Sequence, residues 1–187
     1  MSAEDPMHDE FRGAVLAAVG ELIADRCWSQ ADVTVVAARC GVDKQKIFDA
    51  FGTRSMIAAA YIHYRLDYLL VEIEAVVECG PTLADSVRTA FECFFDVVDE
   101  TLLPLALADR REQSLLLLRA ANEQILARLA GVLRMIEPTL DPVEARLAAG
   151  SVARVALAYL VAPELPRPRA VEQLTALSLT ILDGAHR

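Results

Sequence analysis

Apolar residues recur at helical spacing along almost the whole chain, and no segment shows the alternation that is typical of a strand. The pattern is clear near the start, at offsets 0, 4, 7, 8, 11 and 12: Phe11, Val15, Ala18, Val19, Leu22 and Ile23. Because only 6% of the residues are aromatic and only 8 are glycine, a sandwich or a barrel is disfavoured. The sequence therefore predicts an all-α fold.

Helix breakers and N-cap residues divide this pattern into about nine helices. Asp32, Asp43 and Thr53 stand where N-caps are expected, and Gly41 and Gly52 follow the ends of two short helical stretches. The expected helices cover approximately residues 11–26, 33–40, 44–51, 54–78, 83–98, 102–108, 111–136, 142–161 and 169–183. We expect the first ten residues to form a loose tail.

Charge and hydropathy disfavour several classes of protein. The chain has 27 acidic and 18 basic residues, and a net charge of −9 does not suit a general nucleic-acid coat or binding to anionic membranes. The longest uncharged runs, 55–64 and 173–182, have ten residues each, whereas a membrane span needs about 20. The acidic start of the sequence is not followed by the apolar stretch of a signal peptide. We therefore expect a cytoplasmic bacterial protein with no membrane partner.

No pattern of a catalytic or metal site is visible in the sequence. The cysteines lack the CxxC spacing of zinc and redox sites, and the three histidines lie far apart. Nucleophile elbows, phosphate-binding loops and dinucleotide-binding glycine motifs are missing. We expect four free, buried thiols, no cofactor, no metal and no enzymatic activity. A helical enzyme stays an alternative that only a pocket with strongly perturbed titratable groups would favour.

Residues 32–51 have the pattern of a helix-turn-helix, in which a glycine turn joins two short capped helices. Gly41 can adopt the positive φ that such a turn needs. In the second helix, Ile47 and Phe51 are expected to point inward, and four polar residues outward: Lys44, Gln45, Lys46 and Asp49. The chain has 16 arginines and two lysines, and both lysines stand at the start of this helix. Lysine suits guanine O6 and N7, and glutamine suits adenine N6 and N7, so the pattern predicts a base-reading helix.

This region resembles the TetR family of transcriptional regulators. Residues 36–54 are similar to the family's run Ile-Ala-x-x-Ala-Gly-Val-Ser, then x-x-x-Leu-Tyr-x-His-Phe, then Gly-Ser-Lys. The resemblance implies an N-terminal three-helix helix-turn-helix DNA-binding domain over residues 1–54. It also implies a C-terminal helical domain over residues 55–187 that binds a ligand and forms a homodimer.

The chain departs from the family pattern at several positions of this run. Phe48 replaces a tyrosine that donates to phosphate, and Ala50 replaces a histidine. Asp49 brings a negative charge to the expected DNA face, while Arg54 keeps the positive charge of a lysine that touches phosphate. The candidate DNA-binding residues are Asp32, Thr34, Asp43, Lys44, Gln45, Lys46, Phe48, Asp49, Thr53 and Arg54.

The last two expected helices are apolar on most sides, which favours burial against a partner subunit. No charged residue stands between Glu172 and Asp183. A core helix of a monomer would give the same pattern and stays an alternative. The candidate interface residues are Leu147, Val152, Val155, Tyr159, Leu174, Leu177 and Ile181.

Aromatic and apolar residues of the expected fourth, fifth and seventh helices form a candidate pocket for a hydrophobic ligand. Residues of these kinds are more often plain core than ligand contacts, so core is the favoured interpretation of any single one. The candidate ligand-binding residues are Tyr61, Tyr64, Tyr68, Phe91, Phe94, Phe95, Leu115, Leu118, Arg119 and Asn122.

These features together predict a one-component transcriptional regulator, a repressor that binds a palindromic operator as a homodimer. A small hydrophobic ligand is expected to release the operator. The acidic N-terminal region, Phe48 and Ala50 leave an alternative open, in which a helical small-molecule-binding or scaffold protein has weakened or lost DNA binding.

Overall fold

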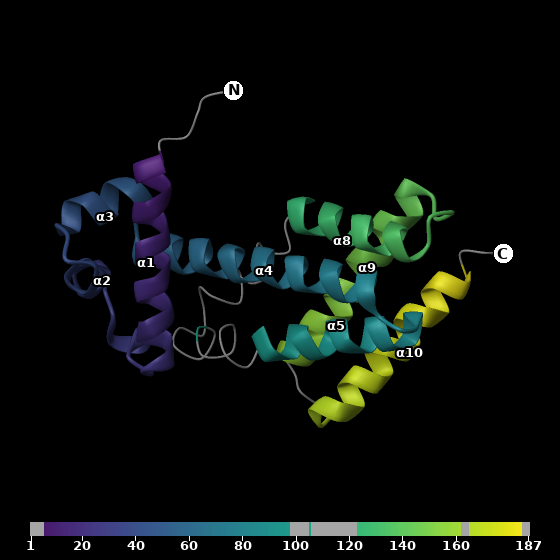
Figure 1. Cartoon of the computed structure of the whole chain (residues 1–187). Coiled ribbons are helices and arrows are strands. Elements are labelled where there is room, and N and C mark those ends of the chain that lie inside the picture. The colour runs from purple at the N-terminus through teal and green to yellow at the C-terminus, as the bar shows by residue number, and fades with distance from the viewer. Residues whose placement is uncertain (1–5, 98–104, 106–122, 162–164, 185–187) are drawn as a thin grey trace. The chain divides into compact units, whose positions relative to one another are not determined.

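The structure, a computed structural model, describes residues 6–97, 105, 123–161 and 165–184 (Figure 1). These residues contain no strand, so the predicted all-α fold is confirmed for the described part of the chain. The helices are α1 (Pro6–Ala24), the 3-10 helix η1 (Trp28–Gln30), α2 (Val33–Cys40), α3 (Lys44–Phe51), α4 (Arg54–Cys79), α5 (Leu83–Val97), α8 (Glu123–Ile136), α9 (Pro142–Val161) and α10 (Arg167–Gly184).

The described residues divide into two compact units, and the division lies within α4. The first unit contains the residues up to Arg65 together with Leu105, and the second contains the others from Leu66 onward. This division comes later than the domain boundary that we expect after residue 54. The first three turns of α4, residues 54–65, thus belong to the same unit as the helix-turn-helix.

The helix bounds agree closely with the sequence pattern except at the start of the chain. The loose tail is wrong for residues 6–10, because α1 begins at Pro6. Proline is well tolerated at the first position of a helix, where its missing N–H would have no partner. The expected helix over 102–108 and the first half of that over 111–136 lie outside the described residues, apart from Leu105, which is helical and buried.

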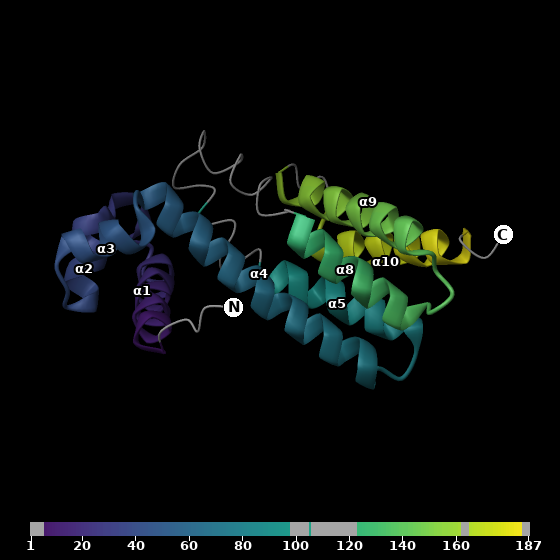
Figure 2. The ribbon, with the colours of Figure 1, turned by 90° about the horizontal axis from the view of Figure 1, so that it is seen from above.

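The first unit is built around α1, which contacts both η1 and α2, while α2 contacts α3 (Figures 1 and 2). Val15, Val19 and Leu22 of α1 are almost fully buried. Gly20 lets α4 approach, because a Cβ there would stand 2.9 Å from the hydroxyl oxygen of Tyr61. Tyr61 of α4 therefore packs directly against α1 at Gly20.

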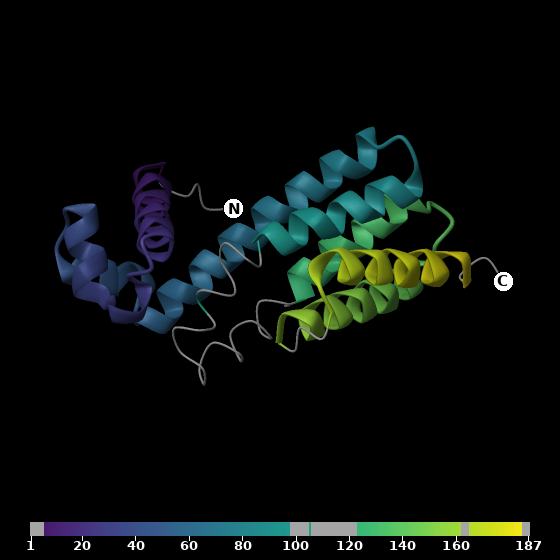
Figure 3. The ribbon, with the colours of Figure 1, turned by 90° about the horizontal axis from the view of Figure 1, so that it is seen from below.

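The second unit has α10 beside α5 and α9, and α9 also lies along α8 (Figures 2 and 3). One cluster of buried residues joins α5, α9 and α10: Val87, Phe91, Phe95, Ala156, Ala170, Val171 and Leu174. A second cluster joins α4, α5 and α8: Leu69, Ile73, Val97 and Val132. The apolar faces that the sequence pattern predicts for these helices therefore meet in the core of this unit.

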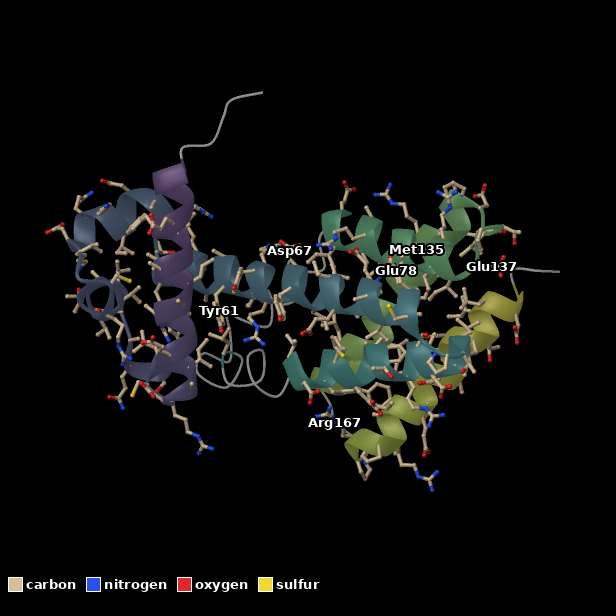
Figure 4. The ribbon with its side chains drawn as sticks, in the orientation of Figure 1. Tyr61, Asp67, Glu78, Met135, Glu137 and Arg167 are labelled. Carbon is tan, nitrogen blue, oxygen red and sulfur yellow. The ribbon has the colours of Figure 1, made fainter. Side chains whose placement is uncertain are left out.

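Ion pairs also connect the helices of the second unit. The guanidinium of Arg128 in α8 bonds to Asp67 (labelled in Figure 4) at 3.2 Å and to Glu74 at 3.0 Å, both on α4. Arg167, at the start of α10, bonds to the carboxylate of Asp96 at 2.6 Å on α5 (Figure 4). These pairs are partly exposed, and such pairs usually stabilise by at most about 1 kcal/mol each.

Candidate nucleic-acid interface

Two aspartates begin the two helices of the helix-turn-helix. Asp32 Oδ1 accepts the backbone N–H groups of Thr34 and Val35 at 2.8 and 2.9 Å. Asp43 Oδ1 accepts the backbone N–H of Gln45 at 2.6 Å. The hydrogen bond from Val35 lowers the pKa of Asp32, with that from Thr34 adding to it, while desolvation opposes them. Both aspartates act as N-caps, and so position α2 and α3.

The turn between the two helices depends on Gly41, which has φ 65° and ψ 30° in the left-handed region. The N–H of Val42 donates to the carbonyl of Ala37 at 3.0 Å, which closes the end of α2. On the inner sides of the two helices, four residues are buried: Val36, Ala37, Ile47 and Phe51. The predicted arrangement of helix, glycine turn and helix is confirmed.

The outer face of α3 is polar and exposed, as the sequence predicts. Lys44, Gln45, Lys46 and Asp49 are all exposed, and the Phe48 side chain beside them is 50% exposed. The side-chain amide nitrogen of Gln45 donates to Asp49 Oδ1 at 2.7 Å, one turn along the helix. Two of the exposed polar side chains of α3 are therefore joined by a hydrogen bond.

Three cations of the first unit lie over aromatic rings of the same unit. Lys46 Nζ stands 4.6 Å from the centroid of the Phe11 ring, and the Arg12 guanidinium stands 4.8 Å from that of Phe51. Such contacts contribute roughly 0.5–1 kcal/mol at exposed sites. The sequence pattern did not reveal these contacts, because each joins residues far apart along the chain.

The third of these contacts changes the interpretation of Arg54. Its guanidinium lies 5.0 Å from the Trp28 ring centroid, and its NH2 donates to the Trp28 carbonyl at 2.9 Å. Thr53 caps the same helix start, because its hydroxyl accepts the N–H of Met56 at 3.3 Å. Arg54 thus joins η1 to the start of α4, a positioning role that the sequence pattern does not reveal.

A further ion-pair cluster ties α2 to α1. Arg39 bonds to Glu21 at 3.0 Å and to Asp25 at 3.3 Å. Two carboxylates therefore offset one guanidinium on this side of the first unit. Lys44, at the start of α3, is exposed, and its positive charge is one of the causes that lower the pKa of Asp32.

The candidate ligand-binding residues lie in different surroundings. Tyr61 is buried in the first unit beside Gly20 (Figure 4). Tyr64 and Tyr68 are 50% and 54% exposed. Phe91 and Phe95 pack with α9 and α10 in the core of the second unit, and Phe94 contacts the same cluster. The other four candidates, Leu115, Leu118, Arg119 and Asn122, lie outside the described residues.

The candidate interface residues of α9 and α10 also separate into groups. Leu174 is 1% exposed and belongs to the core of its own unit, so it offers no surface to a partner. Leu177 and Ile181 are half-buried, as are Val152, Val155 and Tyr159. The hydroxyl of Tyr159 donates to the side-chain oxygen of Gln173 on α10. Leu147 is 68% exposed, and Val143, one turn earlier on α9, is 66% exposed.

The expectation of buried thiols is wrong for two cysteines, because Cys27 and Cys79 are exposed. Burial raises the pKa of the Cys40 and Cys93 thiols. Among the described residues, no three His, Cys, Asp or Glu side chains come together as a metal site would require. No helix in the described part of the chain is long and apolar enough to cross a membrane.

Curated relatives are similar to this chain in sequence, whereas no family model matches it. The transcriptional regulator AlkX of Mycobacterium tuberculosis is 24% identical over 160 residues, which cover 82% of this chain and 76% of AlkX. The transcriptional activator FasR of Mycolicibacterium smegmatis is 28% identical over 91 residues, or 49% of this chain. That match spans 42% of FasR, less than half of its length.

A solved structure has the same arrangement of helices. The TetR-family repressor AlkX from Dietzia sp. strain DQ12-45-1b aligns with a TM-score of 0.79 and 21% identity, and the alignment covers 93% of this chain and 97% of that one. The resemblance that residues 36–54 predict is thus confirmed, and the chain has the fold of TetR-family transcriptional regulators.

Proposed function

We propose that this chain is a one-component transcriptional repressor that binds operator DNA through α3. The observation that carries the proposal is the capped α2–turn–α3 arrangement. Its inner side is buried at Ile47 and Phe51, and its outer side presents Lys44 and Gln45 to solvent. A recognition helix enters the major groove with its N-terminal residues against the base edges. The relatives AlkX and FasR are HTH-type transcriptional regulators, which supports the proposal.

We expect specific binding with little background on other DNA. Non-specific affinity comes mainly from cations that neutralise phosphates. The chain carries a net charge of −9, and Arg39 and Arg54 are engaged within the first unit. Base contacts by Lys44 and Gln45 must then contribute much of the free energy of binding.

We propose that the chain functions as a homodimer that is formed through α9 and α10. Exposed Leu147 and Val143 form an apolar stripe on α9, and half-buried Leu177 and Ile181 lie on α10. Association that covers such apolar surface gains about 25 cal/mol for each Å² removed from water. A dimer with two copies of α3 about 34–36 Å apart would read an imperfect palindrome.

We propose that the regulator binds a small hydrophobic molecule. The AlkX repressor of Dietzia is implicated in the biodegradation of n-alkanes, which suggests compounds with alkyl chains as the first to test. Phe91, Phe94 and Phe95 stay candidate contacts, as do the candidates outside the described residues. A ligand can release the operator only if it binds the form without DNA more tightly than the DNA-bound form.

One observation favours a second candidate, a ligand-binding helical protein with weakened DNA binding. Phe48 is 50% exposed at the position where a hydroxyl would reach phosphate, and Asp49 beside it is negatively charged. Selection of an operator separates the two candidates. The full chain is mixed with random-sequence DNA, and bound sequences are selected and amplified over several rounds. Fluorescence anisotropy then measures the affinity of the full chain for the selected DNA and for shuffled DNA.

The proposal predicts an enriched palindrome that is bound at least 1,000-fold more tightly than shuffled DNA, as is usual for specific sites. Addition of n-alkanes, fatty acids or their acyl thioesters should then include a compound that raises the dissociation constant. Enrichment of no sequence would refute the repressor function and favour the second candidate.

A further inference from the structure

The hydrogen bond between Gln45 and Asp49 gives the acidic residue of α3 a role in base recognition. Asp49 is exposed on α3, and a carboxylate on a surface that faces DNA repels phosphates. Residues four apart on a helix are neighbours, and Gln45 Nε2 donates to Asp49 Oδ1 at 2.7 Å. We propose that Asp49 is a positioning residue that orients the Gln45 amide to read adenine.

The chemistry of the amide allows both contacts at once. A side-chain amide has one acceptor oxygen and two N–H bonds. Asp49 takes one N–H, which leaves the other N–H and Oε1 on the outer edge of Gln45. Adenine N7 accepts an N–H and the N6 amino group donates to an oxygen, so this free edge matches adenine in the major groove.

The charge of Asp49 selects one orientation of the amide. A carboxylate only accepts hydrogen bonds, so the flipped amide, with Oε1 toward Asp49, would be repelled. The backbone N–H of Gln45 is held by Asp43 at 2.6 Å as well. Both the backbone and the amide of Gln45 are therefore oriented before DNA is bound, which lowers the entropic cost of making the base contact.

This inference rests on the proposed DNA-binding function, and its test uses the operator that the full chain selects. Each adenine of one half-site is replaced by purine, which lacks the N6 amino group, or by 7-deazaadenine, which lacks N7. At the adenine that Gln45 reads, both replacements should weaken wild-type binding, and losing the whole bidentate contact corresponds to roughly 5- to 150-fold. The Gln45→Ala variant should not distinguish the replacements from adenine.

Asp49→Asn is the decisive variant, because asparagine has nearly the same shape but can donate as well as accept. It lets the Gln45 amide adopt either orientation, so the ratio of affinities for adenine and purine should fall by at least about twofold, while affinity for all DNA rises as a negative charge is lost. Asp49→Glu, which keeps a carboxylate that can only accept, should restore most of the ratio. Glu10→Gln, an exposed charge of α1 in the same unit, should leave the ratio unchanged.

The outcomes separate the two claims. If Asp49→Asn changes affinity for adenine and purine operators by the same factor, Asp49 acts through charge alone and the inference is wrong, while the proposed function stands. An operator in which no adenine replacement weakens wild-type binding also overturns the inference alone. A wild-type chain that selects no sequence overturns both. Because Asp49 is exposed, each variant should retain the wild-type thermal midpoint, which confirms that it folds.

Discussion

Replacing Gly41 by alanine should destabilise the first unit by about 1 kcal/mol. Gly41 has φ 65°, and a Cβ there would meet nothing within 4 Å, so the cost is backbone strain alone. The left-handed region costs an L-residue roughly 1–2 kcal/mol. Alanine also lowers the conformational entropy of the unfolded chain, and this stabilises the folded state by about 0.4–1 kcal/mol and offsets part of the strain.

Gly13→Ala is a matched control with the opposite expected sign. Gly13 is exposed in the interior of α1, and a Cβ there also meets nothing within 4 Å. Alanine in a helix interior is more favourable than glycine by roughly 0.5–1 kcal/mol, so this variant should gain stability. Gly41→Asn should lose less than Gly41→Ala, because asparagine tolerates the left-handed region.

Urea unfolding followed by tryptophan fluorescence measures these changes in the correct unit. The chain has one tryptophan, Trp28, which is 2% exposed in the first unit. Its emission should shift when that unit unfolds, and the shift of the midpoint gives the change in the free energy of unfolding. A Gly41→Ala variant as stable as wild type, or a Gly13→Ala variant equally destabilised, would refute the assignment of the turn.

Other predictions follow from the caps and from the apolar stripe. The pKa of Asp32 is lowered in the folded chain, so its stabilising effect is complete above the ordinary carboxyl pKa of 3.8 and is lost as the pH falls through the folded value. Asp32→Asn keeps an N-cap, but the free energy of unfolding measured with urea should then depend less on pH in the acid range. An unchanged pH dependence would contradict the role of Asp32 as a charged N-cap. Leu147→Arg and Ile181→Arg should give folded monomers in sedimentation velocity, because arginine at an apolar interface is a buried, unpaired charge. Leu174→Arg should unfold the subunit, since that side chain is 1% exposed. Wild-type dimers for both surface variants would exclude this interface.

The sequence predicts the helix-turn-helix well because its signals are local. Asp43 and Gly41 act on backbone groups within a few residues, and the cap and turn form as the sequence indicates. The spacing of Ile47 and Phe51 on one helix face likewise decides which side of α3 is buried. Short-range hydrogen bonds and periodicity are therefore enough for this part of the fold.

The roles that depend on contacts distant in sequence could not be predicted. Arg54 resembles a phosphate-binding residue in the sequence, yet it bonds to the Trp28 carbonyl in η1. Tyr61 shares a helical stripe with Tyr64, but the space at Gly20 places it in the core of the first unit. Neither outcome is visible from spacing, because each depends on which helix packs against α4.

Leu174 illustrates the same limit in the second unit. The uncharged run of α10 predicts burial, and burial is what the structure shows for this residue. Hydrophobic pattern alone cannot tell whether α5 of the same chain or a second subunit covers a given side. The structure assigns Leu174 to the α5 side.

The central claim is that α3 is the part of the chain that reads DNA. The most direct measurement is the affinity of the full chain for its selected operator across a range of salt concentrations, for wild type and for Lys44→Ala. If Lys44 neutralises one phosphate in each half of a dimer, the slope of log K against log salt should flatten by about 2. If it reads guanine, the slope changes less and discrimination at that base falls by roughly 1–3 kcal/mol. An unchanged affinity and an unchanged slope for the Lys44→Ala/Lys46→Ala double variant would contradict the account.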